Sequence, residues 1–509
     1  MGGNAEVAGP DFSEGVKLAE IAEGSTLAGR VGDEPVLLSR FDGELFAIGG
    51  TCTHYGGALG DGLISGGSVR CPLHHACFDL RTGEMLRAPA LDPVDRWEVE
   101  VEGDRAFVRK KITEPQKQER AATDAQKIVI VGGGAAGLAC ANELRKLGYE
   151  GAIIMLSADS DPPCDRPNLS KDYLAGTAPE EWIPLRPDDW YSDNRIDLRL
   201  GVEVTAVDPD GWSVECASGE RVPFDRLLLA TGAEPNRLST PGFDRDNVFT
   251  LRSLADARAI AERAKSGAKA VIIGSSFIGL EAAASLRKRG VEVDVVAPEE
   301  VPFEKALGRE LGNFFKSLHE ENGVRFHLGL TPASFDGRRV RLSDGEQLDA
   351  DFVLVGVGVR PRTSLGEAAG LASGNGILVD CYLETSAPGI YAAGDIAAYP
   401  DPFTAEPARI EHWVVAERQG QVAAANMLGL KKRFDSAPFF WTEQYGVSVR
   451  YVGHAARPEE IRVEGNLGQR SAAVYYHQDG RRRAAATIDR DGDNLEAELR
   501  LQEEKDRTC

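Results

Sequence analysis

The sequence lacks the features that mark a membrane or exported protein. No apolar run is long enough to span a bilayer, and the chain begins Met-Gly-Gly-Asn-Ala-Glu without a basic and then apolar leader. Positive charge is scarce: 58 Lys and Arg stand against 80 Asp and Glu, which gives a formal net charge of -22. An acidic surface repels nucleic acid and anionic membranes, so small molecules and basic proteins remain as partners. We expect a cytoplasmic protein.

Cysteine is sparse as well. Eight cysteines in 509 residues are too few for a disulfide scaffold. No C-x-x-C or C-x4-C pair occurs, so the chain has no dithiol of the kind that disulfide oxidoreductases use. We expect the isolated Cys140, Cys164, Cys216 and Cys381 to be buried as small apolar side chains.

Four potential metal ligands stand in two short segments, C-T-H at 52–54 and C-P-L-H at 71–74, with sixteen residues and several glycines between them. This spacing predicts a Rieske [2Fe-2S] cluster, with Cys52 and Cys71 on one iron and His54 and His74 on the other. A structural zinc site uses the same side chains and stays an alternative, as does a domain without its cluster. His75 directly follows His74 and is a second candidate for that ligand.

A dinucleotide-binding pattern begins at residue 127. A buried strand over 127–131 leads into a glycine-rich turn and a helix, and a second strand over 152–156 ends near Asp159, where an acid can bind a ribose diol. Backbone amides of such a turn approach a pyrophosphate at the helix N-terminus. The candidate diphosphate-binding residues are Gly132, Gly134, Ala135, Ala136 and Gly137.

The same pattern recurs over 270–296, with Gly274, Ser276 and Gly279 in its turn. Ser276 replaces the second glycine, so we expect weaker or differently placed binding of a second nucleotide. The ribose acid is missing, and Glu299 follows slightly late with Glu300. No Arg or Lys lies between 291 and 304 to hold a 2′-phosphate, and the two carboxylates would repel one. NADH is therefore favoured, with NADPH as the alternative.

Two further segments indicate FAD. A strand that ends in Gly394-Asp395 places a carboxylate where it can accept hydrogen bonds from ribityl hydroxyls. Thr231 and Gly232 end another apolar strand just before the second nucleotide fold.

With these residues in place, the chain resembles the flavoprotein reductases with two dinucleotide folds, a branch of the pyridine nucleotide-disulfide oxidoreductase superfamily. It is similar to ferredoxin and rubredoxin reductases, and specifically to the apoptosis-inducing-factor-like subgroup that has an N-terminal Rieske domain. The resemblance covers nearly all residues from about 15 to 509. Besides the cluster segments and the first glycine-rich turn, it rests on Asp165-Arg166-Pro167, Ala230-Thr231-Gly232, Phe277 to Glu281, Ala393-Gly394-Asp395, Glu411-His412-Trp413 and Phe440-Trp441.

The resemblance implies roles for single residues. Asp159 would bind the adenosine ribose of FAD and Arg166 its diphosphate, while His412 belongs to the flavin shell. Lys171 would lie near the flavin ring and pair with Glu281, which would meet the nicotinamide carboxamide. The aromatic residues with implied roles are Phe277 in the nicotinamide slot and Trp413 and Trp441 around the isoalloxazine. Without the resemblance, Lys171 and Glu281 would read as an ordinary surface ion pair, and core aromatics would be the better interpretation of Phe277, Trp413 and Trp441.

Short alternating strands near 35–38, 44–48 and 97–102 predict an all-β first domain, and polar residues without periodicity after it predict a linker. The resemblance implies the domains that follow. We expect an all-β Rieske domain over 11–111, a linker over 112–126, two α/β nucleotide-binding domains of the Rossmann type and a small α+β C-terminal domain. The expected bounds are 127–250 and 362–430 for the FAD-binding domain, 251–361 for the NAD-binding domain and 435–509 for the C-terminal domain.

These carriers predict an FAD-dependent oxidoreductase that takes hydride from NADH and passes electrons through the fused cluster to an acceptor that the sequence does not name. An oxygenase, a cytochrome or a second carrier would all suit. The alternative is a slow redox-responsive signalling flavoprotein of the apoptosis-inducing-factor type.

Overall fold

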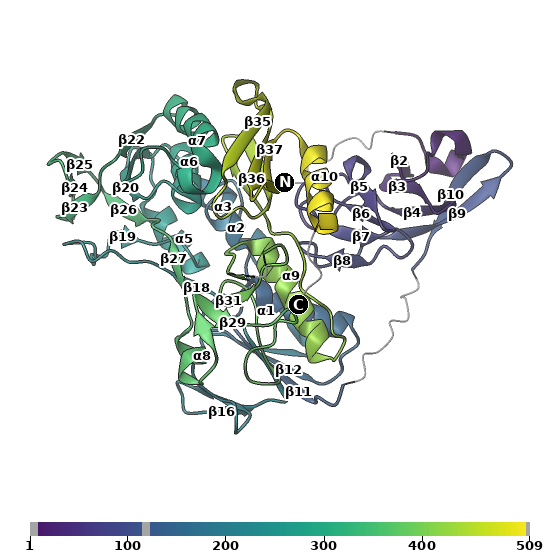
Figure 1. Cartoon of the computed structure of the whole chain (residues 1–509), viewed down its shortest axis with the longest axis horizontal. Coiled ribbons are helices and arrows are strands. Elements are labelled where there is room, and N and C mark those ends of the chain that lie inside the picture. Colours follow the sequence, from purple (N-terminus) through teal and green to yellow (C-terminus); the bar gives the residue numbers. More distant parts are fainter. Residues whose placement is uncertain (1–8, 114–122, 405, 505–509) are drawn as a thin grey trace.

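The computed structural model describes residues 9–113, 123–404 and 406–504. The chain folds into four structural units, the third of which is inserted into the second (Figure 1). Most of the segment expected to be a linker, 114–122, lies outside the described residues. No helix in the described part of the chain is long and apolar enough to cross a membrane.

The first unit consists of two antiparallel sheets. In the strand Arg105–Lys111, buried Ala106 and Val108 alternate with more exposed residues, whereas Val36, Leu37 and Leu38 are buried in succession. The larger sheet has six strands in the order β1 (Val16–Lys17), β10 (Arg105–Lys111), β9 (Arg96–Glu102), β4 (Glu44–Gly49), β3 (Glu34–Phe41) and β2 (Thr26–Val31). The smaller has four, β5 (Leu63–Ser65), β6 (Ser68–Arg70), β7 (Cys77–Asp79) and β8 (Met85–Arg87).

The second unit is a five-stranded parallel sheet in the order β13 (Ile196–Arg199), β12 (Ala152–Leu156), β11 (Lys127–Val131), β17 (Arg226–Leu229) and β30 (Ile390–Ala392). Its strands are nearly continuous apolar runs because both faces are covered. Helix α1 (Ala135–Lys146) packs against α9 (Trp413–Met427). Gly420 permits this close approach, since a Cβ there would lie 2.2 Å from the carbonyl oxygen of Ala136.

The third unit, inserted into the second, repeats the parallel design. Its five strands are β19 (Val248–Phe249), β26 (Phe352–Val355), β20 (Lys269–Ile273), β21 (Glu292–Ala297) and β22 (Val324–Leu328), with helices α5 (Leu254–Arg263), α6 (Phe277–Lys288) and α7 (Glu304–Glu321). Chain segments from both sides of this insertion build the second unit, which explains why β17 pairs with the distant β30.

The C-terminal unit is a five-stranded antiparallel sheet of β33 (Phe439–Gln444), β34 (Val447–Gly453), β37 (Arg481–Ile488), β36 (Ser471–Gln478) and β35 (Glu460–Asn466), followed by α10 (Asp491–Glu504). Helix α10 lies between this sheet and the first unit (Figure 1). The third unit and the first unit lie at opposite ends of the molecule (Figure 1).

The cysteines outside the cluster segments match the expectation with one correction. Cys140, Cys164 and Cys216 are buried and free. Cys381 is also buried, but it takes part in a disulfide. The expectation of an isolated thiol is therefore wrong for Cys381, and no second cysteine near it in the sequence marked the pairing.

Candidate functional site

Two loops of the first unit hold the expected cluster ligands. The loop after β4 holds Cys52 and His54, and the loop between β6 and β7 holds Cys71 and His74. Each loop closes in the same way: the amide of Cys52 donates to the carbonyl of Gly57 at 2.8 Å, and the amide of Cys71 donates to Ala76 at 2.9 Å. The matching loops bring the ligand side chains together.

The four ligands form two pairs. The Nδ1 atoms of His54 and His74 lie 3.1 Å apart. The neighbouring thiol of Cys71, together with burial, raises the pKa of Cys52. Burial lowers the pKa of His54 to about 3 and that of His74 well below its ordinary value. Both imidazoles are therefore neutral, which is the form that binds a metal.

A sulfur pair and a nitrogen pair fit the two irons of a Rieske cluster. Gly57 fits closely over the sulfur side, because a Cβ there would lie 2.7 Å from the Sγ of Cys71. Among residues 9–113, 123–404 and 406–504, no group of three or more His, Cys, Asp or Glu is arranged to hold a single metal ion.

His75, the alternative ligand, lies in different surroundings. Its φ is 61° and its ring is fully buried, stacked on Phe439 with 4.2 Å between ring centroids. Its Nδ1 lies 3.1 Å from Oε2 of Glu498. The structure thus brings His74, and not His75, beside His54.

A cavity of about 1300 Å³ lies between the second, third and C-terminal units. Both nucleotide-binding patterns contribute to its wall, the first through its glycine-rich turn and the second through Ser276 and Phe277. One continuous space is thus large enough for two nucleotides whose reactive rings meet. The other predicted residues that line it are Asp159, Arg166, Lys171, Thr231, Gly232, Glu281, Gly394, Asp395, His412, Trp413 and Trp441.

The first glycine-rich turn fits a diphosphate. Gly132 has a φ of 120°, and a Cβ there would lie 2.2 Å from the carbonyl oxygen of Ala230. At Gly137 a Cβ would lie 2.1 Å from the carbonyl oxygen of Gly132, so this glycine permits close packing of helix and strand. At Gly134 a Cβ would meet only the Nη1 of Arg166, at 4.0 Å. The space beside Gly134 is open, as a bound pyrophosphate requires.

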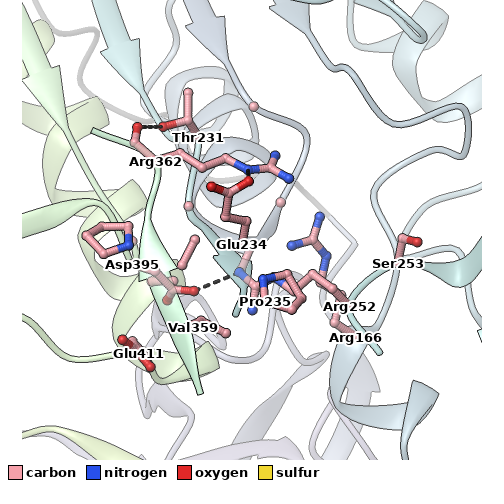
Figure 2. A pocket seen from close by; sticks show the side chains of 18 of the residues that line it. Arg166, Thr231, Glu234, Pro235, Arg252, Ser253, Val359, Arg362, Asp395 and Glu411 are labelled. Atoms are coloured by element: carbon pink, nitrogen blue, oxygen red, sulfur yellow. Dashed lines mark hydrogen bonds and ion pairs between the residues drawn. The ribbon is translucent and has the colours of Figure 1, made fainter. Parts of the chain in front are cut away.

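Charged side chains reach this space from several segments. Arg166 forms an ion pair of 2.9 Å with Asp159, and Arg252 forms one of 2.7 Å with Asp395. Figure 2 shows the guanidinium groups of Arg166 and Arg252 close to each other in the pocket, and Thr231 bonded to the carbonyl of Arg362. The sequence did not single out Arg252, because no local pattern links it to Asp395.

Lys171 and Glu281 form the expected pair, with Nζ and Oε2 2.8 Å apart. Glu281 is buried on α6 and accepts two more hydrogen bonds, from Ser170 at 2.5 Å and from Thr442 at 2.7 Å. The sequence did not point to Ser170 or Thr442. Both are common residues, and only the fold brings the C-terminal unit to α6. The result is a fixed buried carboxylate beside an amine at the cavity wall.

Aromatic side chains close the cavity toward the C-terminal unit. Phe277 packs on Phe440 with 4.8 Å between ring centroids, and His412 also packs on Phe440 at 4.5 Å. Trp441 lines the cavity and also contacts the first unit, with its ring centroid 4.2 Å from that of His74. One side chain therefore spans from the cavity wall to a predicted cluster ligand.

The second glycine-rich turn has the same backbone form as the first. Gly274 has a φ of 109°, and a Cβ at Gly279 would lie 2.3 Å from the carbonyl oxygen of Gly274. Ser276 turns its hydroxyl to the carbonyl of Gly356 at 3.5 Å. The serine is thus accommodated without changing the turn.

Glu299 does not line the cavity. Its carboxylate lies 3.1 Å from the Nζ of Lys305, and Arg309 lies 3.3 Å from Glu300. Cations that follow later in the sequence fold back onto the two carboxylates, so the expected repulsion of a 2′-phosphate is weaker than sequence order indicates.

Comparison with known proteins identifies three parts. Residues 126–420 match the family described as pyridine nucleotide-disulphide oxidoreductase, residues 15–98 the Rieske [2Fe-2S] domain and residues 439–507 the reductase C-terminal domain. The Rieske match decides against the zinc alternative.

Individual proteins resemble the chain over most of its length. Apoptosis-inducing factor 3 of Homo sapiens is 34% identical over 461 residues, which cover 87% of this chain and 76% of that protein. The 5,5′-dehydrodivanillate O-demethylase ferredoxin reductase subunit of Sphingobium sp. is 36% identical over 375 residues, 72% of this chain and 91% of the relative. The covalent putidaredoxin reductase–putidaredoxin complex contains a chain with a TM-score of 0.72 and 33% identity, covering 74% of this chain and 93% of that one.

These matches assign the cofactors FAD, NADH and a [2Fe-2S] cluster, and they make the chain an FAD-dependent NAD(P)H oxidoreductase that transfers electrons. The chain belongs to the pyridine nucleotide-disulphide oxidoreductase family and joins to its reductase an N-terminal Rieske domain.

Proposed function

We propose that this chain oxidises NADH at the flavin cavity, passes single electrons to its own Rieske cluster through Trp441, and reduces an external acceptor from the cluster. The contact between Trp441 and His74 is the observation that carries this proposal. When bound, FAD accepts a hydride and releases electrons singly, which suits a one-electron cluster.

Different residues of the chain would bind the cluster and the FAD. Cys52 and Cys71 would hold one iron and His54 and His74 the other. The turn from Gly132 to Gly137 would bind the FAD diphosphate with Arg166, while Asp159 would bind the ribose. The flavin shell would comprise Thr231, Gly232, Gly394, Asp395, His412, Trp413 and Trp441.

On the nicotinamide side, Lys171 and Glu281 act as one unit. The buried pair would fix the carboxamide, and Phe277 would line the slot so that the nicotinamide stacks on the flavin without intervening water. Hydride transfer needs such near-contact positioning more than it needs an acid or a base. Gly274, Ser276 and Gly279 would support the NADH diphosphate, and Glu299 would act only at the edge of that site.

The acceptor is a ferredoxin-type or other one-electron partner. Relatives named as ferredoxin–NAD(+) reductase components of dioxygenase systems support this class. The acidic charge of -22 favours a basic contact surface on the acceptor. An oxygenase, a cytochrome and a second carrier all satisfy these conditions.

A second candidate is an NADH-responsive signalling role, which the similarity to apoptosis-inducing factor 3 supports. Turnover separates the two. A reductase cycles many times per second with an acceptor, whereas a signalling protein holds reduced flavin and NAD for minutes.

An anaerobic NADH titration followed by optical and electron paramagnetic resonance spectra tests the proposal. We expect both flavin and cluster to be reduced in wild type. Cys71→Ser should lose the cluster spectrum yet still reduce flavin and ferricyanide. If the wild-type cluster stays oxidised after excess NADH, while dithionite reduces it, the proposed electron path is wrong.

A further inference from the structure

Glu498 is a buried carboxylate at the meeting point of three units. It lies on α10, its side chain is fully buried, and cationic groups from two other units surround it. From the Rieske domain, Arg70 lies 2.8 Å and Arg87 3.5 Å from its oxygens. From α9 of the FAD-binding unit, Arg418 lies 3.2 Å away.

The same network reaches the second ligand loop. Arg70 directly precedes Cys71 in the sequence, and His75, which follows His74, places its Nδ1 3.1 Å from Glu498. Arg418 adds a hydrogen bond to the carbonyl of His75 at 3.1 Å. Glu498 therefore contacts this loop through Arg70, which precedes Cys71, and through His75, which follows His74. Its contacts lie beside the ligand side chains and not on them.

Other polar contacts continue the same interface. The amide of Ala88 in the Rieske domain donates to the side chain of Gln421 on α9 at 3.0 Å. Arg418 donates to the carbonyl of Ala88 at 3.2 Å. The amide of Ala88 is thus covered only while the Rieske domain is docked on α9, so it can report on docking.

Glu498 is the anionic centre of this network of arginines, so its charge determines whether the docked arrangement is stable. With its carboxylate, the buried arginines are attracted to a common centre in a medium where the attraction is strong. Without the carboxylate, Arg70 and Arg418 would be left buried and would repel each other and the partly exposed Arg87, whereas an undocked domain would let water solvate them. Neutralising Glu498 should therefore shift the docking equilibrium toward the undocked form.

We propose that Glu498 is the positioning residue that keeps the Rieske domain docked throughout turnover, so that the domain is a fixed relay and not a mobile shuttle. This inference rests on the proposed path through Trp441. It assigns to α10 a role in electron transfer that is separate from NADH oxidation.

The test compares Glu498→Gln with Glu496→Gln, a matched change on the exposed side of the same helix, in the full-length holoprotein. Stopped-flow mixing with NADH should give flavin reduction within twofold of wild type in both variants. Cluster reduction should slow at least tenfold in Glu498→Gln only. Hydrogen exchange at the amide of Ala88 should become faster in that variant, while the paramagnetic signal of the dithionite-reduced cluster stays unchanged.

Wild-type cluster reduction and unchanged protection of Ala88 in Glu498→Gln would overturn the inference. If that variant does not fold, Arg87→Gln, on a partly exposed side chain, should show the same two changes to a smaller degree, and their absence would equally overturn it. An oxidised cluster in the NADH-reduced wild type would instead refute the path through Trp441, so the two failures are distinguishable.

Discussion

His74 and His75 are neighbours in sequence, yet their side chains serve different parts of the molecule. We predict that His74→Ala loses the Rieske spectrum, because one nitrogen ligand disappears. His75→Asn should retain it, since Asn tolerates the positive φ and does not remove a ligand from the pair at His54. Absorption and paramagnetic spectra of the purified variants check this. Loss of the cluster only in His75→Asn would reverse the ligand assignment.

Glu281 allows a second prediction at the scale of one residue. Glu281→Gln removes the charge that holds Lys171, and charge-assisted hydrogen bonds contribute about 1.5–3 kcal/mol. We expect kcat/KM for NADH to fall by about tenfold to a hundredfold, with FAD still bound. Glu443→Gln, on the exposed side of β33, serves as the control and should leave kcat/KM unchanged. Equal values for both variants would contradict the role of Glu281.

Single residues also show which parts of the candidate site could be predicted from the sequence. The cluster ligands and the first glycine-rich turn follow from local spacing, because their chemistry needs fixed residue types a few positions apart. Thr442 lies 161 positions from Glu281, and Glu498 lies 428 positions from Arg70. The members of each pair are common polar residues, and only tertiary structure brings them together. No local sequence pattern therefore predicts these contacts.

At the scale of elements, the strand–turn–helix unit at β11 and α1 makes a sharp prediction. Gly134→Val should leave a folded protein without FAD, because the added side chain enters open space in the cavity and not the protein interior. The cluster spectrum should persist and no longer bleach with NADH. Gly137→Val should fail to fold, since its Cβ would lie 2.1 Å from the carbonyl oxygen of Gly132. Flavin content and circular dichroism distinguish the two, and a flavin-loaded Gly134→Val protein would contradict the prediction.

Helix α7 and strand β33 meet at a buried histidine. The Nε2 of His319 lies 2.6 Å from Oε1 of Gln444, and burial lowers the pKa of His319 from 6.5 to about 4. Between these values the unfolded chain binds a proton that the folded one does not, so stability falls as pH drops from 6.5 toward 4. The integrated loss is roughly 3 kcal/mol.

His319→Gln should remove this contribution. We expect the melting temperature of wild type to fall more steeply than that of the variant between pH 6.5 and 4.5. Parallel pH profiles would show that His319 is protonated in the folded protein or does not contribute.

The elements themselves were largely predictable. Alternating patterns predicted the strands near 35–38, 44–48 and 97–102, and apolar runs beside glycine-rich turns predicted both parallel sheets, since burial on both faces removes alternation. The order of strands was not predictable. β30 joins β17 across an inserted domain, and this pairing depends on long-range packing and not on either segment alone.

At the scale of the whole molecule, the NAD-binding unit lies at one end and the Rieske domain at the other, with the FAD-binding and C-terminal units between them (Figure 1). Trp441 and His74 meet between the C-terminal and Rieske units, while Phe277 and Glu281 face the cavity from the opposite unit. On the proposed electron path, the nucleotide would enter at the cavity and the final electron acceptor would bind at the Rieske domain, so the two would have separate entrances.

Separate entrances have a kinetic consequence for product inhibition. If the acceptor binds at the Rieske domain, as proposed, NAD⁺ leaving the cavity does not occupy the acceptor's surface, so the two should not compete. With a one-electron protein acceptor such as cytochrome c, we expect NAD⁺ to compete with NADH, and its inhibition to persist at saturating acceptor. Inhibition relieved by more acceptor would mean that both ligands share one entrance. Separate entrances would let the enzyme bind a new NADH while the reduced acceptor is still departing from the other end.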